Sequence, residues 1–290
     1  HDLVLTADAI VGGVHFFADD PADAIARKAL RVNLSDLAAK GAQPAGCLLS
    51  LALPKSANEA WLQRFARGLG ADTKRYGCPL IGGDTVWTPG PLMVSVAAFG
   101  TVPSGTMVQR AGARVGDHVF VTGSIGDAAL GLALRGSKAR SRWRLAARLR
   151  RHLLDRYLLP QPRNALAEVL RVHASAAMDV SDGLAGDLAK LCRASGVAAQ
   201  IDVARVPLSA AAQAVLAADG KRIETILTGG DDYEVVGTVR PGKLAAFRTA
   251  TRATGVSVTE IGRIVSGQGA RFLDARGRPL RFAHASFSHF

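Results

Sequence analysis

Several aspartates stand in apolar, small-residue stretches of this sequence, where a carboxylate needs a partner. An ionised carboxylate in such surroundings is costly unless it is paired or binds a metal. Carboxylates that converge also repel one another, and a hard divalent cation removes that repulsion. Mg²⁺ is such a cation, and it combines one or two carboxylates with water and phosphate oxygens. The aspartates are Asp8, Asp36, Asp84, Asp179, Asp182, Asp231 and Asp232.

Each aspartate taken alone has an ordinary structural explanation. Asp182 could cap a helix, Asp36 could lie on a helix surface, and Asp84 could belong to a turn. Their recurrence favours a site, because four of the five segments that carry them place an acid at the end of an apolar strand. Open α/β sheets bind their ligands at that edge.

The segment from Asp179 to Leu184 adds local geometry to this hypothesis. Asp179 and Ser181 alternate along a strand, so their side chains can point the same way. Asp182 follows at a strand-to-helix junction, where free backbone N–H groups favour phosphate. Gly–Gly pairs are a weak signal, but they let the backbone approach an anion closely. The glycine segments are Gly82–Gly83, Gly123–Gly126 and Gly229–Gly230.

Other phosphate-binding and catalytic motifs are missing from the sequence. The GxxxxGK[ST] loop does not occur, since Gly242 and Lys243 are followed by Leu244. GxGxxG after a strand, HExxH and GxSxG are also absent, so nucleotide chemistry here needs another phosphate-binding device. The three cysteines are far apart and form no disulfide framework, which fits a reducing cytoplasm.

The elements that must position these residues are strands and helices in mixed order, which predicts an α/β or α+β fold. We expect a domain boundary within 103–115, which gives an N-terminal domain 1–110 and a C-terminal domain 111–290. A helix capped by Asp20 begins at Pro21 and ends before Gly41. Further helices are expected around 61–69, after 126, at 143–154, 163–173 and 184–195, and from 243. Strands are expected at 3–6, 47–53, 92–102, 118–121, 176–180, 197–203, 233–239 and 256–265, with a hairpin at 272–282.

The charge of the chain is concentrated in one segment. The 290 residues carry a net charge of +12, and nine basic residues with one acid, Asp155, lie between Arg135 and Arg156. A helix with a solvated basic face explains this better than nucleic-acid binding, since zinc-finger spacing and RNP motifs are absent. The longest apolar run, Ala45–Leu53, is too short for a membrane span, which needs about 20 residues.

The ordered set of these segments resembles the thiamine-monophosphate kinase family, from about Leu3 to Phe290. This family belongs to the superfamily of aminoimidazole ribonucleotide synthetase, selenide water dikinase and a hydrogenase-maturation protein. Gly13–Phe16 and the terminal His289-Phe290 favour the thiamine family over its relatives. The other matching segments are Thr6–Asp8, Asn33–Ala39, Gly82–Thr85, Arg110 with Gly116-Asp117, Thr122–Gly126, Asp179–Leu184 and Gly229–Glu234.

The resemblance implies a two-domain fold like that of aminoimidazole ribonucleotide synthetase, in a homodimer paired through the N-terminal sheets. It implies transfer of the γ-phosphoryl group of ATP to thiamine monophosphate with several Mg²⁺ ions. Magnesium would be held by Asp8, Asp36, Asp84, Asp179 and Asp182 with help from Thr6, and Asp36, Asp84, Asp179 and Asp182 would be catalytic. Gly83, Asp84, Arg110 and Ser181 would contact ATP, while His15, Asp231 and Phe287 would contact thiamine monophosphate.

The sequence also departs from the family pattern. A Gly-Asp-Asp-Ala segment with a further magnesium aspartate precedes the first strand in the family, and this chain begins after it, so we expect impaired catalysis. Ala7 replaces a usual threonine or serine, and Gly12 a common glutamate. Asp231 replaces a usual glutamate and is one methylene shorter, which shortens its reach to the substrate.

Three alternatives stay open at this point. The chain could be another ATP-using member of the superfamily, such as a synthetase that closes a ring on formylglycinamidine ribonucleotide. It could be a descendant that binds ATP and Mg²⁺ without transferring phosphate. The alternative that we rank last is a nucleic-acid-binding protein that uses the basic segment, and its affinity would fall steeply as the salt concentration rises.

Overall fold

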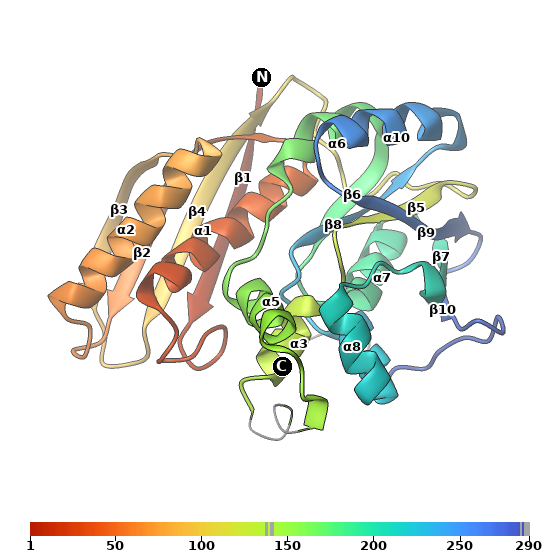
Figure 1. The fold of residues 1–290 in the computed structure, drawn as a ribbon. Helices are drawn as coiled ribbons and strands as arrows, with labels where there is room; N and C mark the ends of the chain where they lie inside the picture. The colour runs from red at the N-terminus through yellow and green to blue at the C-terminus, as the bar shows by residue number, and fades with distance from the viewer. Residues whose placement is uncertain (137–138, 140–141, 285, 287–290) are drawn as a thin grey trace.

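Two sheets, each covered by helices, lie side by side in this chain (Figure 1). The computed structural model describes residues 1–290 except 137–138, 140–141, 285 and 287–290. The mixed α/β architecture is the one that the sequence predicts. The N-terminal part contains β1 (Asp2–Val11), α1 (Ala22–Ala39), β2 (Gln43–Leu53), α2 (Glu59–Tyr76), β3 (Leu80–Trp87) and β4 (Met93–Val102).

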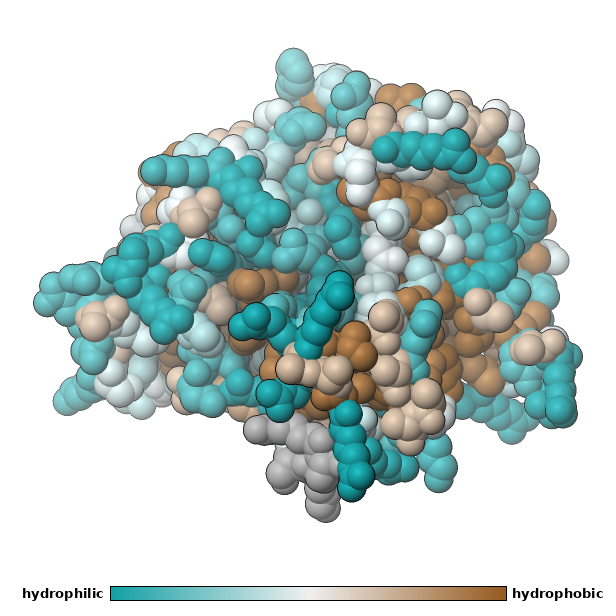
Figure 2. Space-filling view, viewed as in Figure 1, coloured by the Kyte–Doolittle hydropathy of each residue, from teal (hydrophilic) through white to brown (hydrophobic). Residues whose placement is uncertain are grey.

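The N-terminal sheet has the strand order β1-β4-β2-β3. β4 is antiparallel to both β1 and β2, whereas β3 runs parallel to β2 and forms an edge. α1 and α2 cover one face of the sheet, and Leu34, Phe65 and Val96 belong to the core between them. α2 buries few of its residues, and Figure 2 shows hydrophilic side chains predominating over this part of the molecule.

The C-terminal part is a larger helix-covered sheet with the strand order β10-β7-β9-β5-β8-β6. Its pairs are antiparallel except for β10 with β7. Its strands are β5 (His118–Thr122), β6 (Ala174–Val180), β7 (Ala198–Asp202), β8 (Glu234–Val239), β9 (Val258–Val265) and β10 (Gly269–Leu273). Its helices are α3 (Asp127–Ala133), α5 (Ala147–Leu158), α6 (Ala167–His173), α7 (Leu184–Ser195), α8 (Ala210–Ala218), α9 (Ile223–Thr228) and α10 (Leu244–Ala253). Short 3₁₀ turns are η1 (Asn164–Leu166), η2 (Val203–Arg205), η3 (Gly220–Arg222) and η4 (Pro241–Lys243).

Alternation along the strands builds a core on each face of this sheet. Val119 and Val121 of β5 join the core formed with α3, α5, α7, α8 and α9. Phe120, between them, joins the opposite core with Phe247 of α10 and Leu170 of α6. Successive side chains of a strand point to opposite faces, so one strand serves both cores.

α1 links the two parts of the chain. It packs against the N-terminal sheet and also against β6, β8 and α5 of the C-terminal part. Even its polar residues Lys28, Arg31, Asn33 and Ser35 are buried. A buried ionic or polar group needs a partner. The buried polar side chains of α1 must therefore form hydrogen bonds or ion pairs where the two parts of the chain meet.

Several sequence predictions agree with the observed bounds. α2 begins at the cap Asn58, whose side chain accepts a 2.9 Å hydrogen bond from the amide of Trp61, and ends at Gly77 with φ 62°. α7 covers 184–195 as predicted. β1 is longer than the predicted strand 3–6, and β7 and β9 are slightly shorter than expected.

Other sequence predictions are wrong in detail. Asp20 does not cap α1: its side chain accepts from the amide of Phe17, and Pro21 occupies the cap position. Asp8 and Asp84 lie inside β1 and β3 rather than at strand ends. α8 and α9 were not predicted from the sequence. α8 is rich in alanine, so its two faces differ little in hydrophobicity.

The basic segment and the C-terminal hairpin also differ from expectation. α5 starts at Ala147 rather than at 143. β10 pairs with β7, and only an isolated bridge from Leu273 to Pro279 follows the turn among the described residues, so the expected two-stranded hairpin does not form. Within the basic segment, Arg156 forms an ion pair with the buried Glu234, so part of this charge is neutralised internally.

Candidate active site

A cavity of about 690 Å³ lies between the N-terminal and C-terminal parts, and we call it the carboxylate cavity. β1 and α1 line it from one side, and the end of β6, α7 and the loop 229–233 line it from the other. Two glycines let these segments meet: a Cβ on Gly230 would lie 2.5 Å from Ser181 O, and one on Gly183 would lie 2.5 Å from Thr228 O. Six lining residues are acids: Asp8, Asp36, Asp179, Asp182, Asp187 and Asp231.

The first pair of acids is held by hydrogen bonds between β1 and α1. Thr6 donates through its hydroxyl to Asp36 Oδ2 at 2.6 Å. The amide of Asp8 donates to Asn33 Oδ1 at 3.1 Å. Asn33 and Asp36 are neighbours on one helix face, and Thr6 and Asp8 share one strand face. The pattern Asn33-Leu34-Ser35-Asp36 therefore fixes β1 in register on α1.

The second group of acids lies where β6 passes into α7. Asp179 is buried in β6, and Asp182 follows at the junction. The Asp182 amide donates to Asp187 Oδ2 at 2.9 Å. Lys190 donates to both carboxylates, at 2.5 Å to Asp182 Oδ2 and 2.8 Å to Asp187 Oδ1. Asp182 is thus a paired cavity residue rather than a helix cap, since Gly183 caps α7.

The carboxylates of the cavity repel one another electrostatically, and this repulsion contributes to their pKa values. Burial, followed by the charges of Asp36 and Asp182, raises the pKa of Asp8 to about 6. Burial raises the pKa of Asp179 well above its usual value, and the charges of Asp36, Asp187 and Asp8 add to that shift. A cation bound among these side chains would relieve both the burial cost and the repulsion.

The donor set of the cavity suits a hard divalent cation. Carboxylate and hydroxyl oxygens are the ligands that Mg²⁺ prefers, and it usually retains water and phosphate ligands. Among the described residues no group of three His, Cys, Asp or Glu side chains converges closely enough to hold an ion by itself. The charge and donor chemistry therefore fit Mg²⁺, with phosphate and water completing its coordination.

The lining of the cavity also includes His15 and Asp231. His15 Nδ1 accepts from the amide of Val11 at 3.0 Å. Asp231 has φ 73°, and its amide donates to Ser181 O at 2.8 Å. Lys28, which the sequence analysis missed, donates to His15 O at 3.0 Å and to Asp231 Oδ2 at 2.8 Å.

The structure brings together most of the predicted site residues. Asp8, Asp36, Asp179, Asp182, Ser181, Arg110, His15 and Asp231 line the carboxylate cavity, and Thr6 is bonded to one of them. Phe287 lies outside the described residues. Lys190 and Asp187 were missed, although their i, i+3 spacing on α7 is typical of an ion pair.

Gly83 and Asp84 do not reach the carboxylate cavity within one chain. Both lie on β3, which is exposed along its length. Asp84 pairs with Ser50, Ser50 with Ser95, and Ser95 with Ala9 of β1. Three strand spacings, about 14 Å, therefore separate Asp84 from β1. A Cβ on Gly83 would lie 1.9 Å from Leu49 O, so this position requires glycine.

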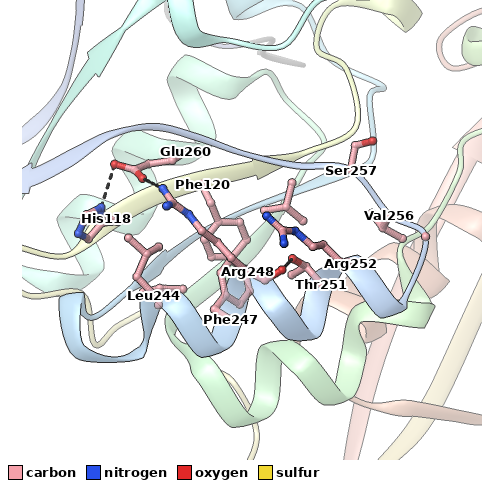
Figure 3. Close-up of a pocket in the computed structure, with 13 residues that line it drawn as sticks. His118, Phe120, Leu244, Phe247, Arg248, Thr251, Arg252, Val256, Ser257 and Glu260 are labelled. Atoms are coloured by element: carbon pink, nitrogen blue, oxygen red, sulfur yellow. Dashed lines mark hydrogen bonds and ion pairs between the residues drawn. The ribbon is translucent and has the colours of Figure 1, made fainter.

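A second cavity, of about 550 Å³, lies between α10 and the strands β5 and β9 (Figure 3). Figure 3 shows Glu260 beside His118 and Arg248. Glu260 Oε1 lies 2.8 Å from His118 Nδ1, and Arg248 donates to Glu260 Oε2 at 2.6 Å. Phe120 and Phe247 pack below them with ring centroids 4.7 Å apart. The predicted site residues lie elsewhere, and this polar group anchors α10 to the sheet.

Two family models match the chain. Residues 1–102 match the AIR synthase related protein, N-terminal domain, and residues 114–274 match its C-terminal domain. The thiamine-monophosphate kinase of Caulobacter vibrioides is 45% identical over 272 residues, which cover 93% of this chain and 75% of that protein. The chain belongs to the thiamine-monophosphate kinase family. The Salmonella typhimurium thiamine-monophosphate kinase is 41% identical over 290 residues, covering 99% of this chain and 86% of that one.

Solved structures of thiamine-monophosphate kinases have the same fold. The Stenotrophomonas maltophilia enzyme has a TM-score of 0.87 and 40% identity, covering 93% of this chain and 85% of that chain. AaThiL complexed with AMPPCP and TMP has a TM-score of 0.85 and 32% identity, covering 99% and 87%. In the described part of this chain, no helix has the length and apolar character needed to cross a membrane.

Proposed function

We propose that this chain is an ATP-dependent kinase that converts thiamine monophosphate to thiamine diphosphate. An oxygen of the acceptor phosphate forms a bond to the γ-phosphorus of ATP. The bond from that phosphorus to the β,γ-bridging oxygen breaks, and ADP leaves with the electron pair. The observation that carries the proposal is the carboxylate cavity, where acids from both parts of the chain face His15 and Asp231 in a member of this kinase family.

Asp8, Asp36, Asp179 and Asp182 are the residues that we propose to hold Mg²⁺. When bound, Mg²⁺ supplies neutralisation of the phosphates and of the charge that develops during phosphoryl transfer. Thr6 orients Asp36 through its hydrogen bond. Lys190 orients Asp182 through its hydrogen bond and pairs with Asp187 at the same time.

Ser181 and Arg110 are the proposed ATP contacts within the cavity. Both line it, and Ser181 follows directly on β6. An arginine can donate two hydrogen bonds to one phosphate, and a hydroxyl adds a further donor. The acceptor would then lie against His15 and Asp231, with Phe287 as a further proposed contact. Holding two anions in line is the main task of the protein in such a transfer.

We further propose a homodimer formed through the outer face of the N-terminal sheet. Large apolar side chains are exposed there, Leu5 by 69% and Val86 by 51%. An exposed apolar face on a sheet with an open edge typically marks an interface. Gly83 and Asp84 lie on β3 at this edge, so a partner chain offers the route by which they could reach ATP.

The three cysteines are buried and free, which fits the cytoplasmic location that we propose.

The decisive experiment measures thiamine diphosphate formed from ATP and thiamine monophosphate, with Mg²⁺ and with EDTA. We expect product only with Mg²⁺. Ring closure of formylglycinamidine ribonucleotide in place of this product would favour the synthetase alternative. ATP binding without transfer to either acceptor would indicate a binding protein, and both results would overturn the proposal.

A further inference from the structure

Lys28 is a buried ammonium group at the meeting point of three segments. Its side chain is only 3% exposed. It donates to His15 O at 3.0 Å, in the loop after β1, and to Asp231 Oδ2 at 2.8 Å, in the loop before β8. It also lies 4.3 Å from the centroid of the Tyr157 ring on α5. An ammonium has three donors and no acceptor, and here each direction has a partner.

These contacts join Lys28 to the two residues that we propose to contact the acceptor. His15 and Asp231 line the cavity, whereas Lys28 stands behind both of them. Asp36, on the same helix, is eight residues further on, which is about 12 Å along the axis. Lys28 is therefore separated from Asp36 along the helix, while it contacts both proposed acceptor contacts.

The charge of Lys28 matters because the acceptor is an anion. Asp231 remains 24% exposed towards the cavity, and alone it would repel an incoming phosphate. Paired with Lys28 at 2.8 Å, it presents a neutral pair in a site of restricted solvent. The same ammonium fixes the backbone of the His15 loop.

We infer that Lys28 is a positioning residue for the phosphate acceptor: it masks the charge of Asp231 and holds His15 in place. The inference rests on the proposed function, and it assigns to Lys28 a part in binding the acceptor of that reaction. Because Lys28 acts through His15 and Asp231, its loss should weaken acceptor binding and leave ATP binding nearly unchanged.

A second buried ion pair on the same helix provides a matched control. Arg31 lies one turn from Lys28, and its Nε contacts Asp72 Oδ2 at 2.5 Å with both side chains 3% exposed. Arg31 also donates to Pro160 O. This pair joins α1 to α2 and is absent from the lining of the carboxylate cavity. Its loss should lower stability without a specific effect on the acceptor.

The first test compares Lys28→Met with Arg31→Met by steady-state kinetics. We expect Lys28→Met to raise the KM for thiamine monophosphate about tenfold or more and the KM for ATP by less than about twofold. Lys28→Arg, which keeps the charge, should recover part of the loss. Arg31→Met should leave both KM values within about twofold. Equal changes in both KM values for Lys28→Met would overturn the inference.

The second test uses a double-mutant cycle and does not depend on Lys28→Met folding. Lys28→Met/Asp231→Asn removes both charges together, so neither is left buried alone. If Lys28 acts through Asp231, adding Lys28→Met to Asp231→Asn should change the acceptor KM by less than about threefold. A full tenfold effect in that background would show that Lys28 does not act by masking the charge of Asp231, and it would overturn the inference.

Binding measurements separate this inference from the proposed function. Calorimetric titration of thiamine monophosphate into the unaltered chain with Mg²⁺ should show binding that Lys28→Met weakens. If the unaltered chain is active and Lys28→Met binds thiamine monophosphate equally well, the inference is overturned and the proposed function stands. If the unaltered chain neither binds thiamine monophosphate nor turns it over, the proposed function fails and the inference fails with it.

Discussion

Thr6 and Asp36 are joined by a 2.6 Å hydrogen bond that crosses from the first strand to the first helix. The hydroxyl of Thr6 donates to Oδ2, so the remaining lone pairs of the carboxylate are directed by this contact. Burial raises the pKa values of Asp8 and Asp179, and the charge of Asp36 adds to both shifts. One strand-to-helix bond therefore orients the acid that interacts with two others.

Removal of this hydrogen bond should impair turnover with little effect on folding. Thr6→Val keeps the shape of the side chain and loses the donor, so Asp36 becomes free to rotate. We expect kcat to fall about tenfold, equivalent to about 1.4 kcal/mol. Thr6→Ser retains the hydroxyl and should stay within about threefold of the unaltered chain. A loss in Thr6→Ser with none in Thr6→Val would show that the packing of the methyl group, not the hydroxyl, supports turnover.

Asp182→Asn should separate a catalytic role from a structural one. Lys190 keeps its 2.8 Å contact with Asp187 in this variant, so the fold loses little. The proposed magnesium charge is lost, and we expect kcat to fall at least about 100-fold. Calorimetry should show a melting temperature lowered by no more than about 3 °C. Asp23→Asn, in an exposed pair with Arg64, is the control and should leave activity unchanged.

A large fall in melting temperature for Asp182→Asn would contradict this assignment. Asp182 would then be a structural residue of the β6–α7 junction. Added Mg²⁺ provides a further readout, because it should raise the melting temperature of the unaltered chain more than that of the variant.

Glu234 should be essential for stability. It is fully buried, accepts from Thr122 Oγ1 at 2.6 Å and pairs with Arg156 and Arg163. Glu234→Gln leaves two guanidinium groups without their counter-charge, so the free energy of unfolding should fall by about 3 kcal/mol. Urea denaturation would measure it. Asp23→Asn breaks a solvent-exposed pair instead and should cost at most about 1 kcal/mol.

The stability of the chain should depend on pH through Asp232. Burial raises the pKa of this carboxyl well above its usual value, although the amide of Gly126 donates to it at 2.7 Å. The folded state then holds the proton more tightly than the unfolded state. The free energy of unfolding therefore falls as pH rises from about 4 towards the folded pKa. Asp232→Asn has no titrating group at this position and does not lose stability in this way. In urea denaturation, the free energy of unfolding of Asp232→Asn relative to that of the unaltered chain should therefore increase from pH 4.5 to pH 7.5. A difference that stays constant with pH would contradict this prediction.

The sequence predicted local features well and long-range pairs poorly. α7 was predicted correctly because its periodicity ends at Gly196, where φ is 68°. The Lys28–Asp231 pair spans 203 residues, and a sequence pattern holds no signal for such a contact. Lys28 does share helical spacing with Ile25 and Val32, both buried, and this spacing is the signal from which its burial could have been predicted.

The position of Asp84 shows a different limit of the sequence. Its motif predicted a place in the cluster, yet the strand order puts β3 at the far edge of the sheet from β1. Register along a strand can be read from alternation, but the order of strands depends on packing across the whole sheet. Whether Gly83 and Asp84 act on ATP therefore depends on what covers that edge.

Val86→Glu tests the proposed dimer and this dependence together. Val86 lies on β3 with 51% of its surface exposed, on the same face of the sheet as Asp84. A charge there should cost the monomer little and oppose burial against a partner. Light scattering after size exclusion should show a dimer for the unaltered chain and a monomer for Val86→Glu. If Asp84 reaches ATP across the dimer, the monomeric variant should lose activity by about 100-fold or more, as should Asp84→Asn. Val172→Glu, 51% exposed on α6, is the matched surface change and should remain dimeric. A fully active Val86→Glu monomer would contradict both the dimer requirement and the proposed role of Asp84.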